Sequence, residues 1–174
     1  MKLYIVRHGQ TGYNIDNKVC GISDVELTSL GKQQAKMASE QLKDISLDMI
    51  FASPLQRAHE TAKIINENHQ LEIKIDSRIQ EINFGKFEGI VNNEFQYYKQ
   101  NHGLHYPGGE SLFQVVYRVY SFLEELENKY PDKNILVVCH GGIVRVIHSY
   151  FQDMTNEELM TWLPENCCIQ SYEK

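Results

Sequence analysis

The chain has 174 residues, of which 42% are hydrophobic and 23% are charged, and its formal net charge at neutral pH is −6. This length is sufficient for a substantial core, so we expect residues 1–174 to form a single domain. The acidic balance argues against nucleic acid as a main partner, and no apolar run approaches the roughly 20 residues that span a bilayer.

The cysteines indicate the cellular compartment of the protein. The four cysteines form no CxxC pair, which favours reduced thiols in a cytoplasmic protein. We expect a monomer or a homodimer with no membrane partner. Because the net charge is negative, an anionic ligand would have to be captured by local cations and not by the overall field.

Strands and helices alternate along most of the chain. In chain order, apolar runs and helical spacing predict a strand at 3–6, a helix at 28–43, a strand at 48–52, a helix at 54–68, a strand at 72–75, a helix at 111–129, a strand at 135–139, a helix at 142–151, a short helix after 155 and a strand at 167–172. This order predicts an α/β fold with a largely parallel sheet and helices on both faces.

Four of the predicted helices begin at a capping signal, in which a hydroxyl accepts a hydrogen bond from a free N–H of the first turn. These signals are Thr28, Ser53 with Gln56, Ser111 with Gln114, and Thr155 with Glu158. Pro54 is expected at the first helical position after Ser53.

The stretch 84–109 interrupts the alternation. It is rich in aromatic residues and ends in a Pro-Gly-Gly turn at 107–109. We expect an insertion that crosses the sheet, is partly helical at 92–100 and lines the substrate side. Its rings either pack against an apolar leaving group or form a small core of their own, and the sequence leaves both possibilities open.

Two of the predicted strands end in the same way. The strand at 3–6 runs into Arg-His-Gly at 7–9, and the strand at 135–139 runs into His-Gly-Gly at 140–142. Open α/β sheets bind ligands beyond the carboxyl ends of their strands. Two imidazoles and an arginine at that edge predict an anion site with histidine as the reacting group.

Two further charged residues complete this set. Arg57 lies near the start of a predicted helix, and Glu81 follows the third strand. Taken singly, each is explained as well by a solvated surface charge, and a histidine at a strand end by a satisfied buried polar group. Their joint occurrence favours an active site.

Several motifs resemble the histidine phosphatase superfamily, which includes cofactor-dependent phosphoglycerate mutases. Residues 3–14, LYIVRHGQTGYN, are similar to its signature. Further segments match in the family's order, at 20–31, 53–58, 81–89, 107–111 and 138–142. The resemblance covers nearly the whole chain. It implies a phosphoglycerate mutase-like three-layer sandwich and a phosphoryl-transfer enzyme.

This resemblance implies a role for each charged residue. It makes His8 the nucleophile that forms a phosphohistidine, while Arg7 and Arg57 keep its ring neutral and hold phosphate oxygens. His140, expected to be protonated beside the phosphate, adds a third donor. Glu81 is the expected general acid and base, with a pKa raised by the substrate's negative charge.

Other positions are expected to bind phosphate or substrate. Gly9 lets the backbone approach the ring and the phosphate, and Asn14 matches a family position that touches the phosphate. Gly141 opens a helix whose free N–H groups can face an anion. Cys20 and Gly21 belong to the same group. We expect no cofactor and no metal, because the other histidines show no metal-ligand spacing.

Departures from the mutase pattern favour a phosphatase. The interval between Glu81 and His140 is short, Cys20 replaces a hydroxyl residue, and Gly142 replaces an asparagine. We therefore expect a phosphomonoesterase for small-molecule phosphate esters, similar to broad-specificity and α-ribazole phosphatases. A cofactor-dependent phosphoglycerate mutase and a phosphate-binding regulator without turnover stay open as alternatives. A P-loop or Rossmann enzyme does not fit, because no glycine-rich motif follows the first strand.

Overall fold

The structure is a computed structural model that describes residues 1–90 and 93–174. Its strands are β1 (Lys2–Arg7), β2 (Met49–Ala52), β3 (Ile73–Ile75), β4 (Asn134–Cys139) and β5 (Ile169–Glu173). Its α-helices are α1 (Gly12–Ile15), α2 (Ser29–Leu42), α3 (Gln56–Asn66), α4 (Asn93–Gln100), α5 (Leu112–Lys129), α6 (Gly141–Phe151) and α7 (Asn156–Thr161). Two short 3₁₀ helices, η1 (Ser77–Ile79) and η2 (Gly85–Phe87), lie between β3 and α4.

The strands form one five-stranded sheet in the order β3-β2-β4-β1-β5. All neighbouring pairs are parallel except β1 with β5, which is antiparallel. β1 and β4 are direct neighbours, and their register pairs Arg7 with Cys139. The segments that follow these two strands therefore leave the sheet side by side at the same edge.

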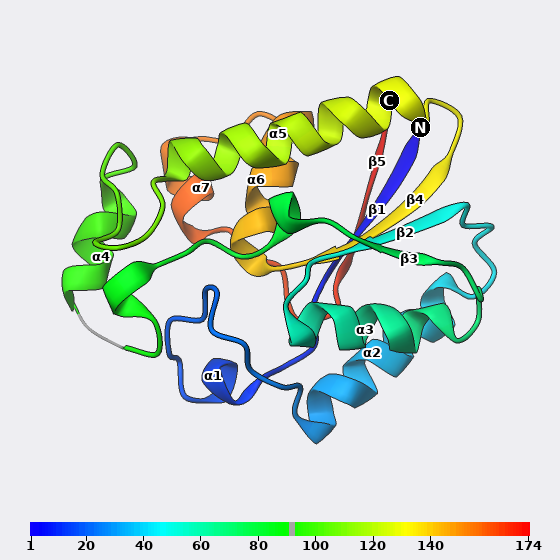
Figure 1. Cartoon of the computed structure of the whole chain (residues 1–174), viewed down its shortest axis with the longest axis horizontal. Coiled ribbons are helices and arrows are strands. Elements are labelled where there is room, and N and C mark those ends of the chain that lie inside the picture. The colour runs from blue at the N-terminus through cyan, green and yellow to red at the C-terminus, as the bar shows by residue number, and fades with distance from the viewer. Residues whose placement is uncertain (91–92) are drawn as a thin grey trace.

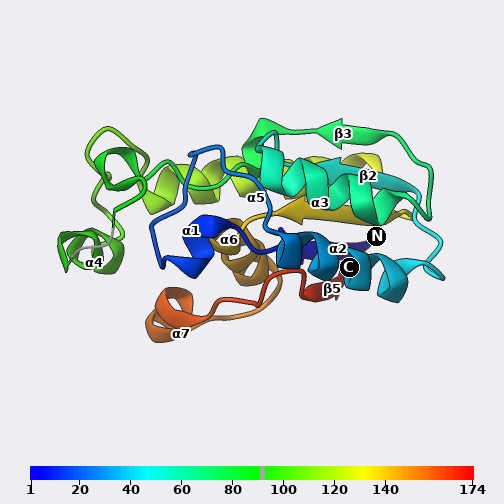
Figure 2. The same cartoon turned by 90° about the horizontal axis from the view of Figure 1, so that it is seen from below.

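Helices cover both faces of the sheet. α5 and α6 lie on one face, and α2 and α3 lie on the other (Figure 1). α4 lies beyond one end of the sheet, far from the two chain termini, in both views (Figures 1 and 2). This arrangement confirms the predicted three-layer α/β fold with a largely parallel sheet.

Each central strand contributes to two cores. Leu3 and Ile5 pack on the side of α5 and α6, whereas Tyr4 and Val6 pack on the side of α2 and α3. Successive side chains of a strand point to opposite faces. Because helices cover both faces, β1 and β4 read as continuous apolar runs in the sequence.

Three of the four predicted caps are confirmed. The Thr28 hydroxyl accepts from the Gly31 N–H at the start of α2. Ser111 with Gln114 and Thr155 with Glu158 form complete capping boxes at the starts of α5 and α7. These caps are local in sequence, so the pattern alone determines them.

The capping box predicted at Ser53 is wrong. α3 begins at Gln56, and no side chain of its N-cap residue Leu55 caps it. The Ser53 hydroxyl lies 2.7 Å from Nε2 of His140, and a distant carboxylate, Asp24, accepts the Gln56 N–H at 2.7 Å. The hydroxyl that a local cap would use therefore bonds to His140, a residue distant in the sequence.

Some element boundaries also differ from the prediction. β5 begins at Ile169, two residues later than expected, because Cys167 has a left-handed φ of 59° that an extended strand does not accept. α3 ends at Asn66, whose side chain bonds the backbone of Leu71. The helix predicted at 92–100 is confirmed as α4 from Asn93, and residue 92 lies outside the described residues.

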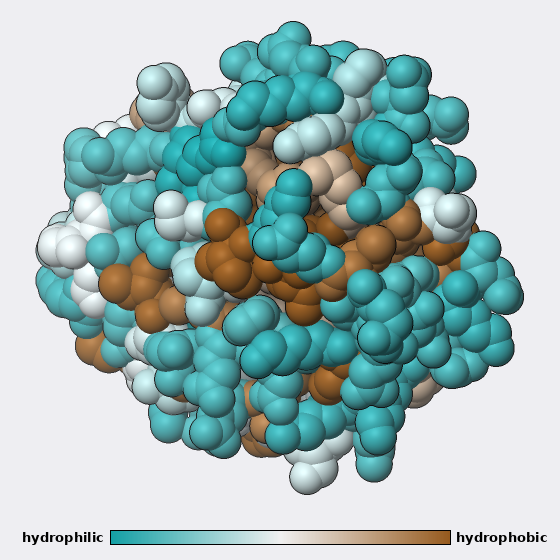
Figure 3. All heavy atoms as spheres, turned by 45° about the vertical axis from the view of Figure 1, so that its right-hand side comes forward, coloured by the Kyte–Doolittle hydropathy of each residue, from teal (hydrophilic) through white to brown (hydrophobic). Residues whose placement is uncertain are grey.

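The molecular surface is mixed in character. Figure 3 shows a largely hydrophilic face crossed by a band of apolar residues. Apolar residues at a surface do not by themselves decide between a monomer and a homodimer, so the oligomeric state stays a prediction, as does the single-domain assignment. None of the helices in residues 1–90 and 93–174 combines the length and the apolar character needed to cross a membrane.

Gly9 follows β1 where the chain touches the start of α2. A Cβ atom at Gly9 would lie 2.3 Å from the carbonyl oxygen of Gly31. We expect Gly9→Ala to lower the free energy of unfolding by about 1–3 kcal/mol, because backbone atoms must move apart. Urea denaturation measures this change. Gly12→Ala is the matched control, since nothing lies within 4 Å of its added Cβ, and equal stability of the two variants would contradict the prediction.

Candidate active site

The pairing of β1 with β4 brings the two strand-end histidines together. The His8 N–H donates to the Cys139 carbonyl at 2.9 Å, which continues the ladder by one residue. The ring centroids of His8 and His140 are 5.2 Å apart. Both rings are buried, so the sheet edge presents two imidazoles in an environment with little water.

The hydrogen bonds of His8 fix its tautomer. Its Nδ1 lies 2.7 Å from the Gly9 carbonyl, and a carbonyl only accepts, so Nδ1 carries the proton. Its Nε2 lies 3.2 Å from Nε of Arg57, which only donates, so Nε2 carries a lone pair. Burial lowers the pKa of His8 well below its ordinary value, and the charges of Arg57 and Arg7 lower it further. His8 is therefore a neutral imidazole with its basic nitrogen at Nε2.

Arg57 is buried in α3 and is held by backbone carbonyls. Its Nη1 donates to Ser23 O at 2.8 Å, and its Nη2 donates to Gly21 O at 2.6 Å. The prediction gave Arg57 the role of a phosphate clamp. The structure ties much of its guanidinium to the protein, so only the remaining N–H groups are available to a ligand.

The loop that holds Arg57 is in turn held by one carboxylate. Glu88 accepts the N–H groups of Gly21, Ile22 and Ser23 at 3.0–3.1 Å, and the Ser23 hydroxyl at 2.6 Å. Hydrogen bonds to charged groups are among the stronger ones in proteins. Glu88 thus fixes the carbonyls that position Arg57, and through Arg57 it supports His8.

Glu81 lies at the amino end of α6. Its carboxyl accepts the Ile82 N–H at 3.0 Å and the Gly142 N–H at 3.1 Å. Burial is the largest influence on this group and raises its pKa, against the N–H groups and the arginines, which lower it. The residue is 6% exposed. Glu81 therefore holds its proton to higher pH than an ordinary glutamate.

Two buried nitrogen atoms of the site have no hydrogen-bond partner among the described residues. They are Nε of Arg7 and Nδ1 of His140. Arg7 also donates from Nη1 to the Pro164 carbonyl at 2.7 Å, which fixes the guanidinium. Buried polar groups without partners are costly. Oxygen atoms of an anionic ligand would satisfy both nitrogens.

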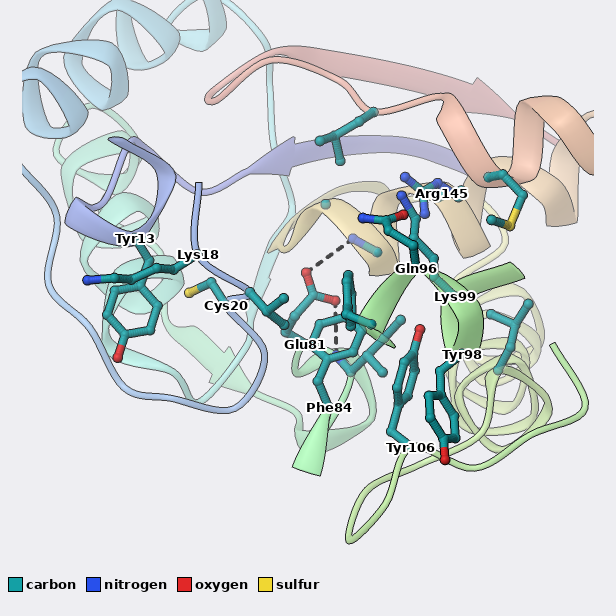
Figure 4. Close-up of a pocket in the computed structure, with 18 of the residues that line it drawn as sticks. Tyr13, Lys18, Cys20, Glu81, Phe84, Gln96, Tyr98, Lys99, Tyr106 and Arg145 are labelled. Carbon is teal, nitrogen blue, oxygen red and sulfur yellow. Dashed lines mark hydrogen bonds between the residues drawn. The ribbon is translucent and has the colours of Figure 1, made fainter. Parts of the chain in front are cut away.

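A cavity of about 590 Å³ opens over these groups. Arg7, His8, Glu81 and Gly141 contribute to its wall. Figure 4 shows Glu81 in the middle of the cavity, with Tyr13, Lys18 and Cys20 on one side and the residues of α4 and α6 on the other. The site thus consists of a neutral histidine, arginines and a buried carboxyl group beside a space for a small molecule.

Comparison with known proteins identifies the family. Residues 3–173 match the sequence model of the histidine phosphatase superfamily, branch 1. The chain belongs to the histidine phosphatase superfamily. The predicted membership is confirmed, and so is the expectation of an enzyme of this phosphatase family.

Individual relatives of this histidine phosphatase carry different names. The uncharacterized phosphatase PhoE of Bacillus subtilis is 34% identical over 172 residues, which cover 97% of this chain and 86% of PhoE. A 2,3-bisphosphoglycerate-dependent phosphoglycerate mutase of Cytophaga hutchinsonii is 32% identical over 170 residues, covering 90% and 80%. The crystal structure of the α-ribazole phosphatase from Shigella flexneri superposes with a TM-score of 0.88 at 26% identity, covering 98% of this chain and 89% of that one.

The predicted site residues of the histidine phosphatase fall into two groups. One group lines the cavity and comprises Arg7, His8, Asn14, Cys20, Glu81 and Gly141. The other group is buried outside the described lining and comprises Gly9, Gly21, Arg57 and His140. Their roles in binding and catalysis stay predictions.

Some of these residues also make structural contacts that the sequence did not predict. Gly9 allows a close approach to the backbone of Gly31, and Gly21 allows a close approach to the Ile82 carbonyl and the Glu88 carboxylate. Burial raises the pKa of the Cys20 thiol to about 11, so it stays protonated. The Asn14 side chain accepts from Thr11 and caps α1.

The surroundings of His140 favour a neutral ring, whereas the sequence predicts a protonated ring beside a bound phosphate. Burial lowers the pKa of His140 well below its ordinary value, and the charges of Arg57 and of other neighbours add to the effect. Its Nε2 is bonded to the Ser53 hydroxyl at 2.7 Å. A neutral ring can still donate one hydrogen bond, from Nδ1, when Nε2 accepts from Ser53.

Sequence reasoning missed several residues that support the site. Arg118 of α5 donates to the Glu81 carbonyl at 3.2 Å and to the carbonyls of Arg78 and Gln80. Asn166 donates to the His8 carbonyl at 2.8 Å. No local pattern signals either residue, because their partners are brought together only by the fold.

Aromatic side chains of 84–109 form a cluster at the wall of the cavity. Phe84, Phe95, Tyr98 and Tyr106 line the cavity, and they also pack against one another with centroid distances of 4.9–6.2 Å. The rings therefore form a small core and present part of it to the cavity. Among the described residues, no cluster of histidine, cysteine and carboxylate side chains is arranged to hold a metal ion.

Proposed function

We propose that this histidine phosphatase hydrolyses small-molecule phosphate monoesters through a phosphohistidine on His8, with Glu81 as general acid and base. The observation that carries the proposal is the tautomer of His8. The Nδ1 proton is held by the Gly9 carbonyl, and the lone pair of Nε2 lies in the site. A nucleophile must present such a lone pair, and general-base assistance is then unnecessary.

The phosphoryl group would bind against nitrogen donors that have no other partner. Nε of Arg7 and Nδ1 of His140 are both buried and unsatisfied in the described structure. The start of α6 adds the positive end of a helix dipole. When a phosphoryl oxygen takes the Arg57 N–H that now bonds to His8, the lone pair of Nε2 is released for attack.

In the first step, Nε2 of His8 forms a bond to phosphorus while the bond from phosphorus to the ester oxygen breaks. Glu81, which burial keeps protonated to higher pH, gives its proton to the departing alkoxide. The alcohol leaves, and the phosphoryl group stays on His8. The arginines balance charge on the transferring oxygens.

In the second step, the ionised Glu81 takes a proton from water, and the water oxygen attacks phosphorus. The bond between phosphorus and Nε2 breaks, and inorganic phosphate leaves. One carboxyl group acts as acid and then as base, and both side chains return to their starting protonation. Arginine side chains balance the negative charge of the phosphoryl group, so the proposal requires no metal ion.

Phosphate release from p-nitrophenyl phosphate in the presence of EDTA tests this function. We expect turnover that continues at constant rate when the chelator is added. A folded protein that releases no phosphate at any pH would contradict the hydrolase proposal and favour a phosphate-binding regulator. Loss of activity on chelation, restored by a divalent cation, would contradict the mechanism.

Mutase activity is the second candidate, because a relative of that name is 32% identical over 170 residues. A mutase returns the phosphoryl group to the bound alcohol, whereas a phosphatase passes it to water. The fate of a labelled phosphoryl group from 3-phosphoglycerate separates the two: inorganic phosphate supports hydrolysis, and 2-phosphoglycerate supports the mutase.

A further inference from the structure

The cavity carries two cations that the proposed mechanism does not use. Lys99 lies on α4, and Arg145 lies on α6. Both line the cavity that contains His8 and Glu81. Figure 4 shows them with Gln96 on one side of Glu81, opposite the side that carries Tyr13, Lys18 and Cys20. They therefore face the same cavity as the reacting groups, with the charge of Arg145 close enough to act on Arg7 and Glu81.

Neither cation is paired with an acidic side chain in the part of the chain that the structure describes. Arg145 donates from Nε to the Trp162 carbonyl at 2.7 Å, and its two terminal nitrogens have no hydrogen-bond partner among the described residues. The side chain of Lys99 forms neither a hydrogen bond nor an ion pair with the described residues. Lys18, on the other side of the cavity, differs because it pairs with Asp16 at 2.9 Å.

The two positive charges disfavour each other. The pKa of Lys99 is lowered by burial and by the charge of Arg145. Burial also lowers the pKa of Arg145, and the nearby Glu81 and Tyr106 oppose that effect without forming an ion pair. Like charges held together in a partly desolvated wall are unfavourable unless an anion lies between or beside them.

The neighbouring side chains can complete an anion site. Tyr106 lies close enough to Arg145 for their charges to interact, and burial raises the pKa of its phenol to about 12, so the hydroxyl can donate. Gln96 contributes an amide to the same wall. A guanidinium, an ammonium, a phenol and an amide are all groups that hydrogen-bond to carboxylate or phosphate oxygens.

We propose that Lys99 and Arg145 form a second anion subsite, which selects phosphate monoesters whose leaving group carries a carboxylate or a second phosphoryl group at its far end. This inference rests on the proposed function only in taking His8 as the site of the first phosphoryl group. Aromatic rings line the same cavity and would contact the carbon atoms of the leaving group.

Calorimetric binding to chains that carry His8→Ala tests the subsite without turnover. 3-Phosphoglycerate and glycerol 3-phosphate differ only in a carboxylate against a hydroxymethyl group. Propane-1,3-diol bisphosphate and its monophosphate differ in a second phosphoryl group. We expect the more anionic member of at least one pair to bind about tenfold more tightly or better, because charge-assisted hydrogen bonds form only with it. The pair that shows the preference identifies the anion as carboxylate or phosphoryl.

Substitution of the cations decides the assignment. Lys99→Met is expected to reduce the preference to about threefold or less, and Arg145→Met to act in the same direction. The Lys99 side chain makes no hydrogen bond or ion pair within the described structure, so its variant stays informative if Arg145→Met fails to fold. Lys18→Met is the matched control, because Lys18 lines the same cavity beside its own partner, and it is expected to keep the full preference.

Equal binding within both pairs would overturn the subsite, as would a preference that Lys99→Met leaves intact. Release of phosphate from p-nitrophenyl phosphate by the unaltered chain is measured in parallel. Its absence would count against the proposed function alone, since the binding preference is measured without catalysis. The two inferences can therefore fail separately.

Discussion

Replacing His8 with alanine abolishes phosphate release from p-nitrophenyl phosphate, with an expected loss in kcat of about 10⁴-fold or more. The loss is large because the covalent intermediate cannot form without Nε2. His140 cannot take over the role, since its own Nε2 is bonded to the Ser53 hydroxyl at 2.7 Å. The neutral ring of His8, held by Gly9 and Arg57, is the feature that the variant removes.

Trapping of the intermediate provides the second measurement for this variant. The unaltered chain, quenched during turnover of a substrate with a labelled phosphoryl group, should carry an acid-labile, alkali-stable label on His8. His59→Ala is the control, because His59 lies on α3 two residues after Arg57 and does not line the cavity. It should keep the native rate and the label. Turnover in the His8→Ala chain, or a label on another residue, would exclude the phosphohistidine mechanism.

The positions of His8 and His140 illustrate how far a sequence can predict a site. Both follow apolar runs long enough for buried strands, and parallel strands deliver their carboxyl ends to one edge of a sheet. The sequence does not state that β1 and β4 are neighbours. Once the sheet order supplies that fact, the two rings lie 5.2 Å apart without any further assumption.

Ser53 and Arg57 show what the sequence pattern cannot provide. Ser53 has the spacing of a helix cap, but its hydroxyl bonds to His140, which is 87 residues away in the chain. An arginine near the start of a helix is usually exposed. Arg57 is nevertheless buried, because the carbonyls of Gly21 and Ser23 accept hydrogen bonds from its guanidinium. Patterns report local preference, and tertiary hydrogen bonds override it.

Lys99 and Arg145 illustrate a further limit. Each is an ordinary charged residue on a predicted helix, and their spacing in the sequence carries no signal. The fold places α4 and the start of α6 on one cavity, and only then do the two charges face the same space. A site formed jointly by residues of an insertion and of a core helix can therefore be recognised only from the structure.

Glu81→Gln should slow hydrolysis by an amount that depends on the leaving group. For an alkyl ester such as glycerol 3-phosphate, we expect a loss of about 10²–10⁴-fold, the usual contribution of a general acid or base. p-Nitrophenolate departs with little help from a proton, so formation of the phosphohistidine should be much less affected. Hydrolysis of the phosphohistidine by water still lacks a base in this variant. The variant should therefore release a burst of p-nitrophenolate and accumulate phosphorylated His8.

The pH dependence of kcat/KM provides an independent check on Glu81. Catalysis requires Glu81 protonated, and its raised pKa extends that form to higher pH, so the rate falls as pH rises through this pKa. Catalysis also requires His8 neutral, and its lowered pKa keeps that form at lower pH, so the rate falls only when pH drops through that value. We expect an optimum on the acidic side of neutrality.

The limb of the profile at higher pH distinguishes Glu81 from other titrating groups. In Glu81→Gln this limb should disappear, while the limb set by His8 should remain. The unaltered chain is measured with the same substrate, so the ionisation of the substrate affects both profiles equally. Glu94→Gln is the matched control, because Glu94 is an exposed carboxylate paired with Lys86. Glu94→Gln should leave the profile unchanged. A high-pH limb that persists in Glu81→Gln, together with equal losses for alkyl and nitrophenyl esters, would show that Glu81 transfers no proton to the leaving group.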